Sequence, residues 1–156
     1  MAGVGEILKI LSAATLGLSG GVILTGAVVM VPSWRASEPT EFLKWFGENS
    51  RTLALLAGPL QLGGLVLATA AAVTSMIGGS SAGERALTLG AAFFALAVLA
   101  QYFLYFQSAN ASFAASSIQI QDVPAELARW AFWQWVRTGL GITAFALSLL
   151  ALRYTR

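Results

Sequence analysis

The sequence predicts an all-α integral membrane protein built as a four-transmembrane-helix bundle. Of its 156 residues, 57% are hydrophobic and only 10% are charged, whereas soluble domains carry about a quarter charged residues. Four apolar segments are each long enough to cross a bilayer core of about 30 Å. The chain length then leaves room for one domain, residues 1–156, and for no separate soluble module.

The four predicted spans are separated by polar or turn-forming residues. The first has no basic leader and no small-residue cleavage site, so we expect it to be retained rather than removed as a signal peptide. An even number of spans places both termini on one side of the membrane. We expect a bacterial cytoplasmic membrane with cytoplasmic termini, although lysine and arginine divide almost evenly between the two sides. The spans cover residues 7–31, 52–77, 86–106 and 130–152.

The connection between the first two spans predicts a short interfacial helix. Residues 40–46 place Thr40 as its N-cap and bring Phe42, Leu43 and Phe46 onto one face. An amphipathic, aromatic helix of this kind lies along the membrane interface or caps the bundle. We interpret it as an interfacial anchor in preference to a lid over a substrate.

Two prolines give further expectations about helix boundaries. Residues 107–127 are polar and nearly uncharged, which predicts a loop that folds over the bundle, with Pro124 marking a new helix from Ala125. Pro59 lies inside the second span and is expected to break or bend it. Glycines such as Gly17 and Gly64 predict close helix packing, either within the chain or between protomers.

Two residue types are missing from the sequence, and their absence restricts the cofactors and catalytic groups that the chain can use. The chain has no cysteine, which excludes disulfides and thiol catalysis, and no histidine, which is the commonest ligand of haem iron, zinc and copper. We therefore expect no metal site and no cofactor. A net charge of +2, dispersed along the chain, also argues against a nucleic-acid partner.

Arg137 is the residue whose position in a membrane-spanning helix costs the most free energy. The apolar stretch from Thr138 to Leu152 rises only about 22 Å as a helix, so a spanning helix has to include residues before Thr138. A guanidinium at this depth costs at least a few kcal/mol unless it faces protein, water or a partner. The sequence therefore predicts that some group in this protein receives Arg137.

Polar residues on three spans predict a pocket around Arg137. They lie in the half of the bundle nearest the two longer connections, so the pocket should open to that side and suit a flat apolar molecule with a carbonyl, phenolate or carboxylate. In the alternative interpretation the tryptophans form an interfacial belt and Arg137 snorkels or binds backbone carbonyls. Trp133, one turn before Arg137, is expected to stack on the guanidinium. The candidate residues are Gln61, Gln101, Tyr105, Asn110, Trp130, Trp133, Gln134 and Arg137.

Several of these residues resemble a known family. Gly58-Pro59, Asn110, Arg129-Trp130 and the stretch from Trp135 through Arg137 to Gly141 are similar to the anthrone-oxygenase-like domain of unknown function, a family of small four-helix membrane proteins. The resemblance covers the four-span layout. It implies oxidation of anthrones to anthraquinones by dioxygen without metal or flavin, with Asn110, Trp130 and Arg137 in the pocket.

The chain departs from this family at Gln134, where family members often carry histidine. Glutamine is not a base near neutral pH, so the resemblance supports the fold more strongly than the reaction. In the enzyme hypothesis, a cofactor-independent oxidoreductase uses Arg137, Gln134 and Asn110 in catalysis on a lipophilic aromatic or quinone-like substrate. The substrate would contact the other five candidates: Trp130, Trp133, Tyr105, Gln101 and Gln61.

The alternative hypothesis is a non-catalytic protein. Its partners would be the lipid bilayer and a bound lipid or quinone, or it would serve as a structural subunit of a homo-oligomer or larger membrane assembly. In that case Arg137 would form hydrogen bonds or an ion pair within the bundle, and the glycine-rich faces would contact partners.

Overall fold

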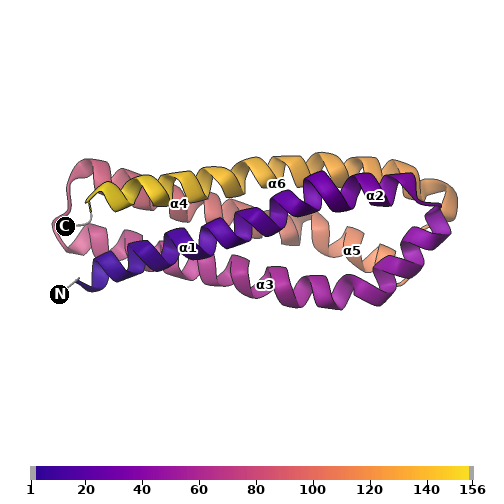
Figure 1. Ribbon diagram of the computed structural model, residues 1–156, viewed down its shortest axis with the longest axis horizontal. Coiled ribbons are helices and arrows are strands. Elements are labelled where there is room, and N and C mark those ends of the chain that lie inside the picture. The colour runs from indigo at the N-terminus through magenta and orange to yellow at the C-terminus, as the bar shows by residue number, and fades with distance from the viewer. Residues whose placement is uncertain (1–2, 155–156) are drawn as a thin grey trace.

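The computed structural model describes residues 3–154, which form four long helical rods of 33 to 39 residues joined by short connections (Figure 1). Rods 1 and 3 each contain a π-helical segment between two α-helices. Rod 1 comprises α1 (Val4–Thr25), η1 (Gly26–Met30) and α2 (Val31–Ala36), and rod 2 is α3 (Pro39–Ile77). Rod 3 comprises α4 (Ala82–Gln101), η2 (Tyr102–Phe106) and α5 (Gln107–Ala114), and rod 4 comprises η3 (Ile120–Asp122), α6 (Val123–Ala151) and η4 (Leu152–Tyr154).

The predicted all-α architecture with four helices is confirmed, but the rods are longer than the predicted spans. The expected loop over residues 107–127 is wrong for its first part, because rod 3 continues as helix to Ala114. Phe113 explains the extension, because the burial of its ring stabilises the two further turns of helix that carry it into the core. Pro124 lies in the first turn of α6, within two residues of the predicted start.

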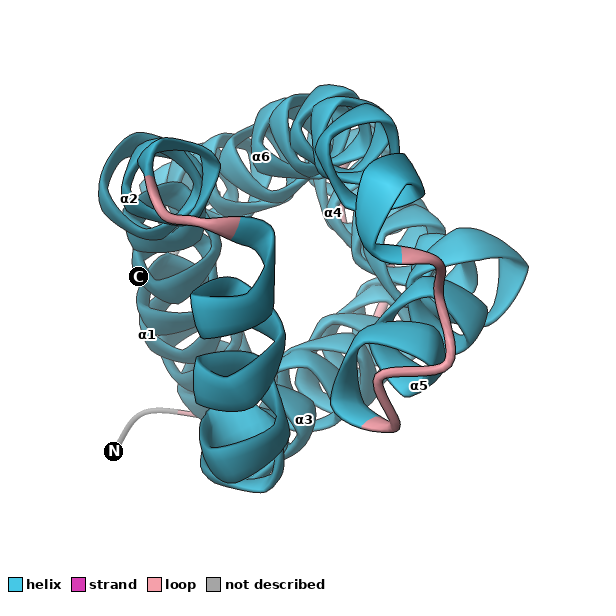
Figure 2. Cartoon of the chain, turned by 90° about the vertical axis from the view of Figure 1, so that its right-hand side faces the viewer, coloured by secondary structure: helices cyan, strands magenta, loops and turns pink. Residues whose placement is uncertain are grey.

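The predicted interfacial helix is not a separate element. Residues 40–46 form the first turns of α3, which begins at Pro39 after an N-cap at Glu38 and runs unbroken through Pro59. Phe42 and Phe46 are buried against residues of the other rods, and Figures 1 and 2 show the first turns of α3 inclined across the end of the bundle before the helix runs along it. Figure 1 shows α3 continuing along the bundle to its far end.

The rods form a ring in which each has two neighbours. Rod 1 packs on rods 2 and 4, and rod 3 also packs on rods 2 and 4. Figure 2, which looks along the bundle, shows this order around the ring. Rods 1 and 3 are therefore diagonal partners, as are rods 2 and 4, so contacts between diagonal partners have to cross the centre.

The core divides into two parts of different composition. At the end away from the termini lies an aromatic cluster, which includes Trp34, Phe42, Phe46, Phe113 and Trp130. The half nearer the termini is filled by small residues around Leu16: Ala68, Ala91, Ala95 and Ala144. The small residues let the rods approach closely, as the sequence predicted.

Some of the predicted glycine contacts lie within the chain. A Cβ at Gly17 would come 2.9 Å from the ring of Phe145, and a Cβ at Gly64 would come 2.9 Å from Leu16. Gly139, in contrast, faces open space. The glycines at the rod interfaces therefore pack this bundle, while others lie on its outside.

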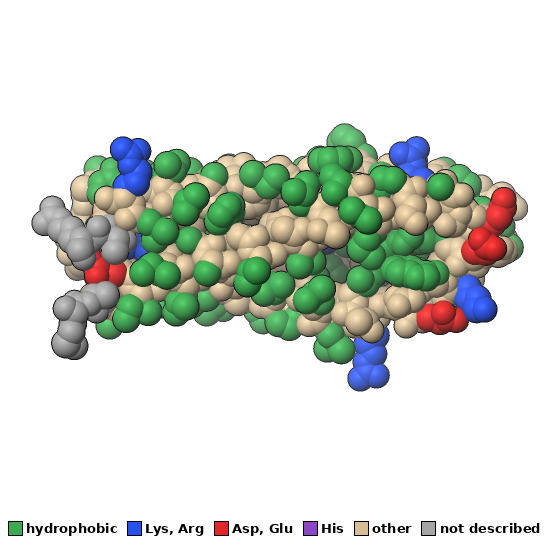
Figure 3. All heavy atoms as spheres, in the orientation of Figure 1, with side chains coloured by type: hydrophobic (Ala, Val, Ile, Leu, Met, Phe, Trp, Pro, Cys, Tyr) green, Lys and Arg blue, Asp and Glu red, His purple; other side chains and the backbone are tan. Residues whose placement is uncertain are grey.

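The outside of the bundle is apolar along most of its length. Large hydrophobic side chains such as Leu18, Leu62 and Phe93 are more than half exposed, and Figure 3 shows charged side chains gathered towards the two ends. By length and composition, all four rods could cross a membrane. Residues 52–77 of α3 carry no charge and rise about 39 Å, which exceeds a bilayer core.

Candidate functional site: the buried arginine cluster

Arg137 lies inside the bundle, where only 8% of its surface is exposed. Its Nη2 donates a hydrogen bond to Oε1 of Gln61, so α6 is linked to α3 across a diagonal of the ring. The guanidinium carbon lies 4.8 Å from the centre of the Phe106 ring, within the range of a cation–π contact. The structure thus brings together Arg137 and Gln61, two of the predicted site residues.

The expected stacking of Trp133 on Arg137 is wrong, because Phe106 contacts the guanidinium instead. Trp133 lies against the ring of Tyr105, with 5.9 Å between ring centres. Phe106 ends the π-helical segment η2, and a π-helical turn contains more residues than an α-helical one. The extra residue rotates Phe106 toward the interior, which an α-helical periodicity does not predict.

The charge of Arg137 has no carboxylate partner among residues 3–154, where the ion pairs are Lys9–Glu84 and Arg129–Glu126. Three buried polar atoms also lack a hydrogen-bond partner in this part of the chain: Nε of Arg137, Oε1 of Gln101 and Oε1 of Gln134. An unmet buried hydrogen bond costs about 1–3 kcal/mol. Buried polar atoms of this kind usually bind water or a ligand.

These unpartnered atoms lie at one depth of the bundle. Trp130 bonds to Asn110, and Gly141 faces Val98, so the antiparallel rods place Gln101 level with Arg137. The donor on Arg137 and the acceptor on Gln101 therefore belong to the same layer. We call the set Arg137, Gln61, Gln101 and Gln134 the arginine cluster.

Gln134 joins rod 4 to rod 1. Its Nε2 donates a 2.7 Å hydrogen bond to the backbone carbonyl of Ile23, just before the π-helical segment η1. Gly26 makes this approach possible, because a Cβ there would lie 2.8 Å from Nε2. The amide that we expected to act on a substrate is thus bound to backbone through its nitrogen, and only Oε1 is unpartnered.

Replacing Gly26 by alanine should therefore destabilise the bundle. The added methyl group forces Gln134 away from the Ile23 carbonyl, and we expect the free energy of unfolding to fall by about 1–3 kcal/mol. Gly21→Ala is the matched control, since nothing lies within 4 Å of a Cβ at Gly21. Unfolding in detergent, followed by circular dichroism, measures both; equal effects of the two substitutions would contradict the assignment.

Asn110 and Trp130 form a second, separate group. Trp130 Nε1 donates a 2.9 Å hydrogen bond to Oδ1 of Asn110, and the indole packs edge-on against Phe106 and Trp34. Trp130 precedes Arg137 by about 10 Å of helix rise. The structure therefore places Asn110 in the aromatic end of the bundle and apart from the guanidinium.

Tyr105 also has a partner that the sequence analysis missed. Its hydroxyl donates a 2.8 Å hydrogen bond to Glu126, which pairs in turn with Arg129. The predicted single pocket therefore divides into the arginine cluster and the aromatic end, which contains Asn110, Trp130, Tyr105 and Trp133. Glu126 is three residues before Arg129 on one helix, so their pairing was visible in the sequence.

A small cavity lies next to the arginine cluster. Its volume is about 10 Å³, and Ser19, Ile23, Gln61 and Gly141 are among the residues that line it. This volume is about that of one water molecule. A tricyclic aromatic molecule would need a rearrangement of the surrounding side chains to enter here.

Both π-helical segments lie at the level of this cluster. The segment η1 follows Ile23 and contains Gly26, while η2 follows Gln101 and ends at Phe106. Single π-helical turns inside α-helices occur frequently at functional sites. Their position next to a buried cation makes the arginine cluster the strongest candidate site in the described part of the chain.

No protein family, curated protein or solved structure matches this chain. The resemblance to anthrone-oxygenase-like proteins therefore stays a prediction based on the residues quoted for it. The described residues contain no group of three or more His, Cys, Asp or Glu placed to hold a metal ion. Conclusions about function thus depend on the geometry of the arginine cluster.

Proposed function

We propose that this chain is an integral membrane protein whose arginine cluster binds the oxygen-bearing end of a lipophilic, quinone-like aromatic molecule. The observation that carries the proposal is the guanidinium of Arg137, which is buried without a carboxylate partner among residues 3–154 and has an unbound Nε. A buried ionisable residue in a membrane helix is a functional candidate by default.

The membrane assignment follows from the distribution of charge. Arg51 and Arg129 are exposed near the aromatic end and are expected to mark the membrane boundary there. Arg137 follows Arg129 by about 12 Å of helix rise, and Gln61 follows Arg51 by about 15 Å. In a core of about 30 Å these two residues lie near the membrane centre. We keep the bacterial cytoplasmic membrane and cytoplasmic termini as part of the proposal.

The chemistry of the unpartnered atoms favours a hydroxyl or carbonyl oxygen. Nε of Arg137 can donate to such an oxygen, and Oε1 of Gln101 or Gln134 can accept from its hydroxyl proton. A hydroquinone or phenol offers both functions on one atom. Its apolar ring would suit the surrounding apolar residues and lipid.

Entry of such a molecule requires movement, because the adjacent cavity holds about one water. We place this movement at η1 and η2, where the regular hydrogen bonding of the α-helix is interrupted. The lipophilic ligand would arrive from the bilayer, between rods, and would displace water from the arginine cluster.

Oxidoreductase activity remains the more specific form of this proposal. Arg137 would stabilise an enolate or phenolate, as in the enzyme hypothesis. However, the Asn110 oxygen binds Trp130 and the Gln134 amide nitrogen binds Ile23, so Gln134 offers its unpartnered Oε1, which accepts hydrogen bonds and cannot donate one to an oxyanion. The geometry therefore supports ligand binding better than turnover.

The structural alternative also has a specific observation in its favour. Arg137–Gln61 and Gln134–Ile23 link rod 4 to rods 2 and 1, and the cavity beside them is small. In this alternative the cluster holds the bundle together, as a lone protein or as a subunit of a larger membrane assembly.

Mass spectrometry of molecules that co-purify in mild detergent tests the proposal. We expect a lipophilic aromatic molecule with wild type and with Arg129→Gln, whose arginine is exposed on the same helix. Arg137→Gln should retain about tenfold less or lower, because it loses a charged hydrogen bond of about 1.5–3 kcal/mol. Size-exclusion chromatography confirms that each bundle is assembled.

Two outcomes would contradict the proposal. An assembled wild-type protein with no bound molecule, or equal retention by Arg137→Gln, would favour the structural alternative. Oxygen consumption with an added anthrone, present in wild type and lost in Arg137→Gln, would establish the enzyme hypothesis as well.

A further inference from the structure

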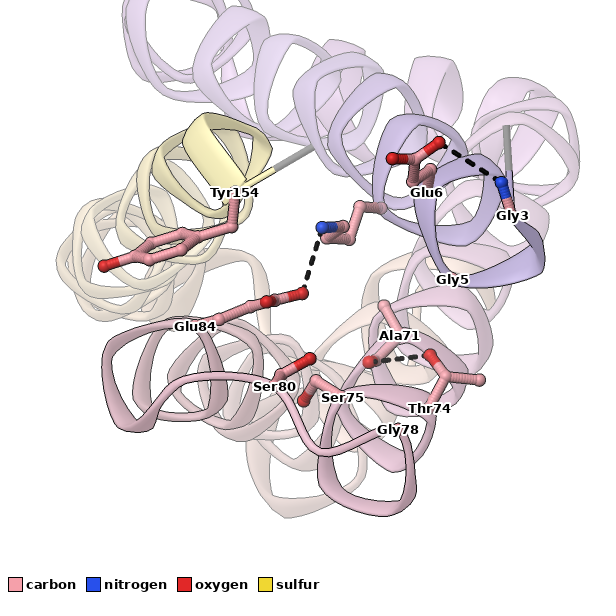
Figure 4. A pocket seen from close by; sticks show the side chains of 11 residues that line it. Gly3, Gly5, Glu6, Ala71, Thr74, Ser75, Gly78, Ser80, Glu84 and Tyr154 are labelled. Atoms are coloured by element: carbon pink, nitrogen blue, oxygen red, sulfur yellow. Dashed lines mark hydrogen bonds and ion pairs between the residues drawn. The ribbon is translucent and has the colours of Figure 1, made fainter. Parts of the chain in front are cut away.

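A second, larger pocket lies at the end of the bundle where both termini are found (Figures 1 and 4). Its volume is about 400 Å³, which suits a small molecule. All four rods or their connections contribute to its walls. Polar residues that line it include Glu6, Lys9, Thr74, Ser75, Ser80 and Glu84. We call it the terminal pocket.

An ion pair lies inside the terminal pocket. Lys9 Nζ donates a 2.9 Å hydrogen bond to Oε1 of Glu84, and the two side chains are only 6% and 13% exposed. Lys9 belongs to rod 1 and Glu84 to rod 3, so the pair crosses the second diagonal of the ring. Figure 4 shows the Glu84 carboxylate directed toward the centre of the pocket.

Both members of this pair have unused hydrogen-bonding capacity. An ammonium group has three donors, and among the described residues Lys9 has one acceptor, Glu84 Oε1. The other carboxylate oxygen of Glu84 has no hydrogen-bond partner among those residues. The unused donors and the unused acceptor lie at the wall of one cavity.

The terminal pocket is separate from the arginine cluster. Ser75 at its wall pairs with Thr88 at 2.8 Å, and Ser12, one turn after Lys9, pairs with Ser148 at 3.1 Å. The small-residue core around Leu16 then fills the interior before the arginine cluster begins. A ligand in the terminal pocket therefore does not depend on the function proposed for Arg137.

The charged side chains that line the pocket restrict the kind of ligand: Lys9, Glu84 and Glu6, whose Oε2 accepts a 3.2 Å hydrogen bond from the Gly3 backbone. A simple anion near Lys9 would be repelled by the carboxylates, and a simple cation near Glu84 would be repelled by Lys9. A zwitterion can place its negative group near the Lys9 ammonium and its positive group near the Glu84 carboxylate. We propose that the terminal pocket binds a small zwitterion of amino-acid size, with its acid group on Lys9 and its ammonium on Glu84.

The absence of cysteine allows a direct test. Ser80→Cys places a single thiol in the pocket wall, and a methanethiosulfonate reagent measures its access. The probes are β-alanine and the standard α-amino acids except cysteine, whose thiol would consume the reagent, with propionate and propylamine as singly charged comparisons. At about ten times its Kd, a bound zwitterion should slow the labelling about tenfold.

Two further variants identify where the protection comes from. Ser37→Cys carries its thiol on an exposed residue between α2 and α3, outside the terminal pocket, and its labelling should not change with any probe. Protection of Ser80→Cys should disappear when Glu84→Gln is added, because the ammonium loses its charged acceptor. Chromatography and circular dichroism show that the double variant is folded.

Three labelling results would contradict the zwitterion proposal. If no zwitterion slows labelling of Ser80→Cys, or if propionate or propylamine protects as well as the zwitterions do, the proposal is wrong. Protection that persists in the folded Glu84→Gln protein would overturn it too, since the assigned ammonium contact would then contribute nothing.

Discussion

Phe113→Ala is expected to lower the free energy of unfolding by about 3–5 kcal/mol, as is typical of removing a buried aromatic ring. Phe113 has no exposed surface. Its ring packs edge-on against Phe42 at 5.1 Å and Phe46 at 5.6 Å between ring centres, both in the first turns of α3. The substitution therefore removes the contact between the end of rod 3 and the start of rod 2.

Phe103→Ala is the matched control, because Phe103 lies on the same rod and is 62% exposed. We expect that change to alter stability by no more than about 0.5 kcal/mol. Denaturant titration in detergent micelles measures both proteins. Equal effects would show that the aromatic cluster does not anchor the end of the bundle.

The start of α3 illustrates what the sequence predicts and what it does not. The face formed by Phe42, Leu43 and Phe46 was correctly identified as apolar, and all three residues are buried. An apolar face says nothing about what covers it, however. The covering residue Phe113 lies far away in the chain, so the direction of the helix depends on a tertiary contact.

Arg137 was the most predictable part of the candidate site. The apolar stretch after it is too short to span a bilayer, so length and helix rise predicted that Arg137 meets protein, water or a partner, with snorkelling as the alternative. The structure buries it inside the bundle. Gln61 was predictable as a candidate because polar residues are scarce in the second span. That Gln61 and Arg137 meet across a diagonal depends on the order of the rods around the ring.

Phe106 and Lys9 were missed for different physical reasons. The π-helical segment before Phe106 changes which face of the rod this residue occupies, and helical periodicity does not reveal such a segment. Lys9 lies near the end of an apolar segment, where a long side chain ordinarily reaches water. Only the fold shows that it turns inward to Glu84.

Breaking the Lys9–Glu84 pair on one side is the second change with a large expected effect. Lys9→Met leaves the Glu84 carboxylate without its partner, and Glu84→Gln leaves the Lys9 ammonium without its partner. The two side chains are only 6% and 13% exposed, so water stabilises the remaining charge poorly. We expect each single change to cost about 3–5 kcal/mol, the range for a buried charge left unpaired. Water in the terminal pocket would bring the cost toward the lower limit.

The double variant Lys9→Met/Glu84→Gln distinguishes pairing from packing. It leaves no unpaired charge, so its cost should be well below the sum of the single costs, and the difference measures the coupling. The pair Arg129–Glu126 provides the control, since its arginine side chain is 65% exposed; Arg129→Met should cost no more than about 1 kcal/mol. Additive costs at Lys9 and Glu84 would contradict a direct interaction. A double variant as stable as wild type would instead show that the pair adds little to folding, which would favour retention of the two charges for the ligand of the terminal pocket.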